Sequence, residues 1–294
     1  YLITNKTISF LLFASFTILI SCTPIQLKPT PTAELNPSTE AQSLAGSSTI
    51  KAVQKTPSSN VNLSKNLWSR LFSLYQFPTI ENDRIQAEID WYSKHPDYLI
   101  RVQQNAKPYL FHIVNEIEKR GLPGELALLP IVESAYKPFA YSHGRAAGLW
   151  QFIPSTGVAY GLKQTWWYDG RRDVYASTNA ALTYLTKLSK RFDDDWFLAL
   201  AGYNAGGGSV SSAMRKNRRL GRPTDFWALS LREETRHYVP KLIAIASILA
   251  NADKYNVTLI DIPNEPFFEK VNITKQLDLA RAAELAEISI EDLY

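Results

Sequence analysis

From residue 66 to about residue 255, apolar side chains recur at the spacing of one helix face. The first run places Trp68, Leu71 and Tyr75 at i, i+3 and i+7, and a later run places Ala244 and Ile248 at i and i+4. No stretch in this range alternates apolar and polar residues convincingly, as a half-buried strand would. The pattern therefore predicts an all-α domain.

Proline, glycine and N-capping residues predict where these helices begin and end. Pro78 ends the first helix and Pro96 ends the second. Pro108 kinks the third helix, and Gly121 supplies its C-terminal stop. Asp173 is a good N-cap for a later, longer helix. We expect helices at about residues 66–77, 83–95, 97–120, 123–134, 155–160, 173–192, 196–204, 208–218 and 233–255.

The first 22 residues are typical of a bacterial export signal. Lys6 precedes an apolar run, Ile8–Ile20, which is too short to span a bilayer comfortably and matches the hydrophobic region of a secretory signal. The run ends in Leu19-Ile20-Ser21-Cys22, which resembles a lipobox. We expect a lipoprotein signal peptide over residues 1–22 and a lipid on Cys22; an uncleaved anchor with an incidental cysteine is the alternative. Thr23 favours the periplasmic face of a Gram-negative outer membrane.

Residues 23–64 turn to Pro, Thr, Ser, Ala and Gln with almost no aromatic residues. Such a composition cannot bury a core, so we expect a disordered linker. A coil of this length reaches roughly 35 Å, enough to let an anchored domain search a layer near the membrane. Residues 65–265 then form the folded domain.

Residues 266–294 change character and form a C-terminal extension. Phe268–Val271 is strand-like, and Leu277–Glu287 has a helical pattern. The arrangement weakly resembles the opening of a LysM module, a small peptidoglycan-binding unit, whose closing strand would lie beyond residue 294. A capping extension is the alternative.

Composition excludes several classes of site. The net charge of +4 is mild and neither requires nor excludes a polyanionic partner. The single cysteine rules out an intrachain disulfide, and no phosphate-loop motif is present. We expect no metal, no cofactor and no nucleic-acid partner. The aromatic residues are more informative, because they are either core or flat platforms for sugar rings. The clusters are Trp150, Trp166–Tyr168 and Tyr203.

One carboxylate stands where a general acid would. Glu133 follows the apolar run Leu128–Val132, and desolvation raises the pKa of a carboxyl group. Cleaving a glycosidic bond requires an acid that is still protonated near neutral pH. A glutamate at the end of a hydrophobic helix is more often a solvated helix end, so this position needs further support.

Four motifs in order give that support: Glu133-Ser134, a segment from Ser142 to Thr156 containing Gly-Leu-Trp-Gln, Ala201–Gly206, and Glu234–Val239. Together they resemble the motifs of family-1 soluble-type lytic transglycosylases (glycoside hydrolase family 23), most closely those of its membrane-bound D group. The resemblance covers about residues 65–265. It implies a lysozyme-like helical catalytic domain, related in fold to goose-type lysozyme.

The resemblance also implies an activity on peptidoglycan glycan strands. Glu133 falls on the catalytic acid, which protonates the bond between N-acetylmuramic acid and N-acetylglucosamine. It then acts as a base on the muramoyl 6-hydroxyl, which attacks C1 and gives a 1,6-anhydro product without water. The protein is expected to be a monomer. Substrate-binding positions fall on Ser142, Gln151, Tyr203, Asn204, Glu234 and Tyr238.

Two other functions remain open. An inverting hydrolase needs a second carboxylate about 6.5–9.5 Å from the acid to activate water, and goose-type lysozyme resembles this family in fold. Asp169, Asp173 and Asp193–Asp195 are candidates on paper. A non-catalytic lipoprotein that only grips glycan strands would keep its function after Glu133→Gln.

Overall fold

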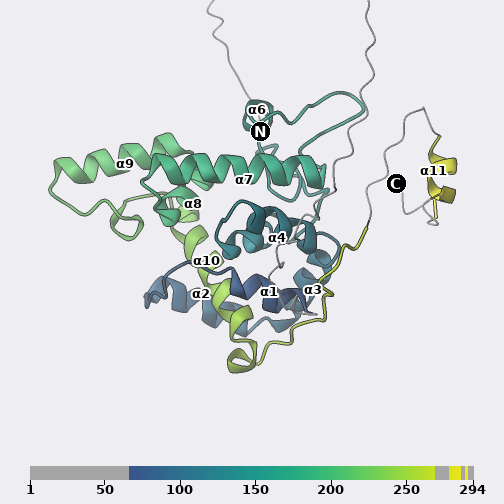
Figure 1. Ribbon diagram of the computed structural model, residues 1–294. Coiled ribbons are helices and arrows are strands. Elements are labelled where there is room, and N and C mark those ends of the chain that lie inside the picture. The colour runs from purple at the N-terminus through teal and green to yellow at the C-terminus, as the bar shows by residue number, and fades with distance from the viewer. Residues whose placement is uncertain (1–65, 269–277, 286–288, 291–294) are drawn as a thin grey trace, which may run out of the picture. The chain divides into compact units, whose positions relative to one another are not determined.

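The computed structural model describes residues 66–268, 278–285 and 289–290 of the chain (Figure 1). All described residues belong to one compact unit. The expected signal peptide, the expected lipidation site Cys22 and the expected linker lie outside the described residues, as does most of the strand expected from Phe268 to Val271. No helix in the described part is both long and apolar enough for a membrane span.

The described residues form helices joined by loops and contain no named strand, which confirms the all-α prediction. Three short segments, η1 to η3, are 3₁₀ helices. The elements are α1 (Leu67–Ser73), α2 (Asp83–Ser93), α3 (Pro96–Ala106), α4 (Leu110–Lys119), η1 (Gly124–Leu128), α5 (Leu129–Ser134), α6 (Pro154–Ala159), α7 (Val174–Arg191), α8 (Trp196–Ala205), α9 (Gly207–Arg219), η2 (Phe226–Ala228), α10 (Glu233–Ala250), η3 (Ala252–Tyr255) and α11 (Leu279–Leu285).

Helix starts follow the capping chemistry of the sequence. The Asn82 side chain accepts a hydrogen bond from the backbone N–H of Arg84 at the start of α2. Asp173 does the same for Ala176 at the start of α7, as predicted. Each cap satisfies backbone N–H groups that have no partner inside the helix.

Several predicted helix boundaries were wrong. The single helix expected over residues 97–120 is two helices, α3 and α4, because Pro108 interrupts the helix instead of only kinking it. Pro96 opens α3 as its first residue, a position where the missing N–H costs nothing. The helix expected over residues 123–134 starts as the 3₁₀ turn η1, and α10 stops at Ala250 before η3.

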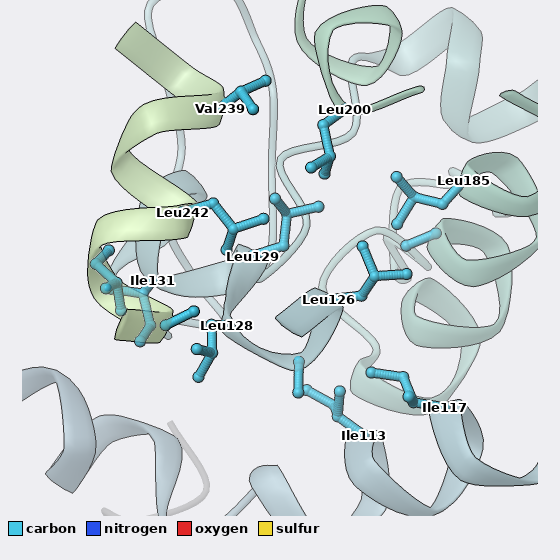
Figure 2. Close-up of a cluster of buried hydrophobic side chains, with 14 of the residues drawn as sticks. Ile113, Ile117, Leu126, Leu128, Leu129, Ile131, Leu185, Leu200, Val239 and Leu242 are labelled. Carbon is cyan, nitrogen blue, oxygen red and sulfur yellow. The ribbon is translucent and has the colours of Figure 1, made fainter. Parts of the chain in front are cut away.

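The segment formed by η1 and α5 lies in the middle of the hydrophobic core. Figure 2 shows its leucines and isoleucine surrounded by side chains of α4, α7, α8 and α10. Leu126, Leu128 and Leu129 have no exposed surface, and burying each stabilises the fold by about 2 kcal/mol. Since Glu133 lies near the end of this segment, the core fixes the position of the glutamate.

Candidate active site

One cavity of about 560 Å³ collects every side chain that the sequence predicted for the site. Glu133 comes from α5, Ser142 and Gln151 from the following loop, and the rest from α8 and α10. Four segments that are distant in the sequence therefore meet at one place. The predicted residues lining this cavity, called here the Glu133 cavity, are Glu133, Ser142, Gln151, Tyr203, Asn204, Glu234 and Tyr238.

Glu133 is held by a phenol from α10. The hydroxyl of Tyr238 donates a short hydrogen bond to Oε1 of Glu133. Burial raises the pKa of the Glu133 carboxyl to about 7, although the Tyr238 hydrogen bond lowers it; the charge of Glu234 raises it further. At neutral pH a large share of Glu133 is thus protonated, which a general acid requires.

The backbone turns sharply at the end of α5, directly after Glu133 and Ser134. Ala135 and Tyr136 both adopt positive φ angles, 51° and 60°, so the chain turns immediately after the helix. Tyr136 is fully buried and its hydroxyl donates to the carbonyl of Ala127, which anchors the turn in the core. Ser134 Oγ donates to the carbonyl of Leu149 at 2.9 Å. This bond ties the helix end to the loop that carries Gln151.

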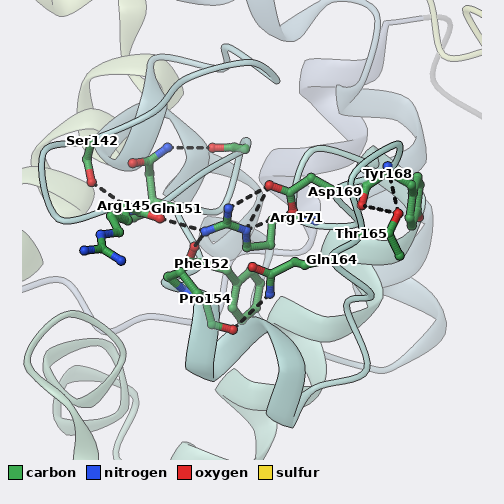
Figure 3. A network of polar contacts seen from close by, with 12 residues as sticks. Ser142, Arg145, Gln151, Phe152, Pro154, Gln164, Thr165, Tyr168, Asp169 and Arg171 are labelled. Atoms are coloured by element: carbon green, nitrogen blue, oxygen red, sulfur yellow. Dashed lines mark hydrogen bonds and ion pairs between the residues drawn. The ribbon is translucent and has the colours of Figure 1, made fainter.

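Ser142 and Gln151 line the cavity, and in the structure their side chains also bind their own loop. Ser142 Oγ accepts from the backbone N–H of Ala146 at 3.0 Å. Gln151 Nε2 donates to the carbonyls of Gly148 at 2.9 Å and Ala140 at 3.3 Å (Figure 3). These bonds use the amide nitrogen of Gln151 and fix the loop's shape.

A buried arginine, which the sequence did not single out, supports this loop from behind (Figure 3). Arg171 is 6% exposed and pairs through Nη2 and Nε with Asp169, at 2.7 and 2.9 Å. Its Nη1 donates to the carbonyls of Arg145 and Phe152, at 2.7 and 3.1 Å. Gly148 has φ of +85°, and a Cβ there would lie 1.8 Å from the carbonyl oxygen of Arg171. Only glycine fits at this contact.

Tyr203 and Asn204 join α8 to the other walls of the cavity. The Tyr203 hydroxyl donates to the carbonyl of Trp150 at 2.8 Å. Asn204 donates to Glu234 at 3.1 Å and accepts from the Thr235 hydroxyl at 2.6 Å. Burial raises the pKa of Tyr203 well above its usual value, and the charge of Glu133 raises it further, so Tyr203 stays a neutral donor.

The three predicted aromatic clusters lie in three different environments. Trp150 has no exposed surface and its indole N–H donates to Thr178 at 3.0 Å, so of the two interpretations left open it is a core residue and not a sugar platform. Trp166 and Trp167 are each 90% exposed but lie outside the Glu133 cavity. Tyr203 alone of these residues lines it.

The aspartates considered as the base of a hydrolase lie elsewhere. Asp169 pairs with Arg171, Asp173 and Asp195 cap α7 and α8, and Asp194 pairs with Lys190. Within the described residues, the second carboxylate lining the cavity is Glu234. Lys241, which no sequence motif singled out, also lines the cavity from α10. Its helical spacing could have identified it, because Lys241 follows Glu234 at i+7 and Tyr238 at i+3 and so lies on the same helix face as both.

Comparisons with known proteins identify the family that this chain resembles. Residues 113–226 match the family model described as the transglycosylase SLT domain. The chain is 44% identical over 228 residues to membrane-bound lytic murein transglycosylase D of Escherichia coli strain K12, covering 78% of this chain and 50% of that protein. It is also 44% identical over 136 residues to an Alteromonas sp. protein named for tributyltin chloride resistance, covering 45% of this chain and 66% of the relative.

A solved structure of an inactive mutant of the lytic transglycosylase Slt from Pseudomonas aeruginosa is 24% identical, with a TM-score of 0.35, over 53% of this chain and 25% of that one. The chain spans about half the length of the E. coli relative that it matches. On the SLT match and the identity to lytic murein transglycosylase D, the chain belongs to the lytic transglycosylase family.

Proposed function

We propose that this protein is a peptidoglycan lytic transglycosylase, which cleaves the β-1,4 bond between N-acetylmuramic acid and N-acetylglucosamine and forms a 1,6-anhydro-muramoyl end. The observation that carries the proposal is the environment of Glu133. Its carboxyl group has a pKa of about 7, accepts a hydrogen bond from Tyr238 and lines a cavity large enough for sugar rings. The names of the relatives support peptidoglycan as the substrate.

In the first step Glu133 acts as an acid. Tyr238 occupies Oε1, which leaves Oε2 to carry the proton. That proton passes to the glycosidic oxygen as the C1–O bond breaks, and the positive charge that develops at C1 is balanced by the new carboxylate. The Tyr238 hydroxyl stabilises this carboxylate, because a hydrogen bond to the charged form favours it.

In the second step the same residue acts as a base. The Glu133 carboxylate takes the proton of the muramoyl 6-hydroxyl, whose oxygen attacks C1 and closes the anhydro ring. The carboxyl group is protonated again and is ready for another cycle. Both steps require a pKa near the working pH, because one group must give and then take a proton.

A muramidase is the second candidate, and Glu234 is the observation that favours it. Glu234 is a second carboxylate in the cavity, so it could activate a water molecule. Mass spectrometry of digested peptidoglycan separates the two reactions. A transglycosylase gives anhydro-muramoyl ends, whereas a hydrolase gives reducing ends that are one water heavier. Reducing ends as the main product would refute the proposed reaction.

Glu133→Gln tests whether the protein is an enzyme at all. The amide keeps the size of the side chain and cannot give or take the proton. We expect purified sacculi to be solubilised by the wild type and left intact by Glu133→Gln, while circular dichroism shows the same helix content. A wild type that releases no muropeptides would instead support a protein that only grips glycan strands.

We further propose that the protein acts as a monomer and is anchored by a lipid on Cys22 to the periplasmic face of the outer membrane. The lipobox-like sequence and the membrane-bound name of the relative support the anchor. Residues 23–64 would serve as the linker and residues 266–294 as an extension of the catalytic domain over residues 65–265. Labelling with a radioactive fatty acid, lost on Cys22→Ser, tests the anchor. Labelling that persists in this variant would refute it.

A further inference from the structure

A second cavity, of about 530 Å³, adjoins the Glu133 cavity. The two cavities share Val132 and Lys241 in their linings. Val132 precedes Glu133 in α5, and Lys241 lies on the same helix as Tyr238. The two cavities therefore meet at these two residues. We call this space the α2–α10 cavity. Its other lining residues used below are Glu88, Trp91, Tyr98 and His237.

Most of this cavity lies outside the part of the chain that matches the SLT domain. That match covers residues 113–226, whereas Glu88 and Trp91 belong to α2 and His237 to α10. Helix α10 contributes residues to both cavities. Glu234, Tyr238 and Lys241 line the Glu133 cavity, and His237 and Lys241 line the other. The second cavity is therefore a feature that α2, α3 and α10 add to the matched domain.

The apolar wall of the cavity is built before any ligand arrives. Trp91 is 48% exposed, although the ring of His95 stacks on it at a centroid distance of 4.2 Å. The rings of Tyr92 and Tyr98 pack against Trp91 at 4.9 and 6.1 Å. Such a wall loses little conformational freedom when it binds a ligand.

The other wall carries charge. Glu88 is 8% exposed, and its Oε1 lies 2.8 Å from Nδ1 of His237, which leaves Nε2 of the half-exposed His237 for a ligand. Lys241 is partly buried at the junction of the cavities. Among the described residues, no carboxylate lies within ion-pair distance of its ammonium group. A cation in this position favours a ligand that brings a carboxylate.

We propose that the α2–α10 cavity binds the peptide stem carried by a muramoyl residue at the cleavage site, and that Lys241 pairs with a carboxylate of that stem. The inference rests on the proposed function. In peptide-bearing glycan the lactyl carboxyl is part of an amide, so the sugar chain itself is neutral. The charged groups belong to the peptide, which bears carboxylates and a diamino acid. A charged cavity that opens beside Glu133 matches the peptide better than another neutral sugar.

The test compares glycan strands with and without peptides, prepared from one batch of sacculi by treatment with or without an amidase. Affinity is measured by titration calorimetry in a Glu133→Gln background, so that no turnover occurs. We expect tighter binding of the peptide-bearing strands and a loss of about tenfold in that preference on Lys241→Met, as for one charged hydrogen bond. Trp91→Ala, as a second variant, should lower the same preference.

Lys187→Met is the matched control, because Lys187 is an exposed lysine of α7 outside both cavities. It should leave the preference unchanged. Equal affinity for both strands, or a preference that survives both Lys241→Met and Trp91→Ala, would overturn the inference. Turnover of the wild type on the two strands is measured separately. Failure to cleave either strand would refute the proposed function, whereas the affinities would still decide the inference.

Discussion

Replacing Tyr238 with phenylalanine should move the pH range of the proposed transglycosylase activity. The Tyr238 hydroxyl donates to Oε1 of Glu133 and so stabilises the charged carboxylate. Without this bond the pKa of Glu133 rises above its value of about 7. Because the first step needs the protonated acid, activity is lost as pH rises through this pKa. The alkaline side of the pH–activity curve should therefore shift to higher pH in Tyr238→Phe.

The size of the shift follows from the bond that is lost. A hydrogen bond to a charged group contributes about 1.5–3 kcal/mol, and one pH unit corresponds to about 1.4 kcal/mol. We expect the alkaline side to move by about 1–2 pH units. The rate at the optimum should also fall about ten- to a hundredfold, because the carboxylate formed in the first step loses its donor.

The assay is kcat/KM for soluble glycan strands, measured from pH 4 to pH 10 in buffers of constant ionic strength. Two further variants test whether the shift comes from the contacts of Glu133. Glu234→Gln removes a negative charge that raises the pKa of Glu133, so its alkaline side should move to lower pH. Tyr203→Phe removes a phenol of the same cavity that donates to Trp150 instead, so its curve should keep its position. Shifts of Tyr238→Phe and Glu234→Gln in the same direction would refute this account of Glu133.

Three further predictions concern stability, each measured by urea unfolding. The Glu133 carboxyl group has a pKa of about 4.5 in the unfolded chain and about 7 in the folded protein, so the free energy of unfolding falls as pH rises through this range. Glu133→Gln stays neutral and should therefore be more stable than the wild type by up to about 3 kcal/mol at pH 8.5. Most of this difference should be gone at pH 5. Gly148→Ala should lower the free energy of unfolding by more than about 3 kcal/mol, because its Cβ would collide with the backbone of Arg171. Gly161 has a similar φ of +82° with open space around it, so Gly161→Ala should lower the free energy of unfolding by only about 1 kcal/mol. Arg171→Met should lose about 3–5 kcal/mol, since it leaves Asp169 unpaired, and an unchanged midpoint would contradict the supporting role of Arg171.

The helices could be predicted from the sequence wherever local chemistry decides them. A cap such as Asp173 acts within three residues, so its predicted position was correct. Prolines were less predictable, since their effect depends on distant contacts. Pro108 ends helical structure between α3 and α4, whereas α10 continues through Pro240. Pro240 is buried in a helix that packs against α2 and α8, and this packing offsets the missing hydrogen bond.

The members of the site could be predicted from motifs, but the origin of its chemistry could not. Leu128–Val132 indicate only that Glu133 follows a buried segment. Burial is the largest cause of its raised pKa, and the two side chains that adjust this pKa, Tyr238 and Glu234, come from α10, more than a hundred residues later. Local sequence cannot specify such a distance, because it depends on how η1, α5 and α10 pack in the core. Substitutions in that packing should therefore change the pH dependence of activity even when they leave every motif residue in place.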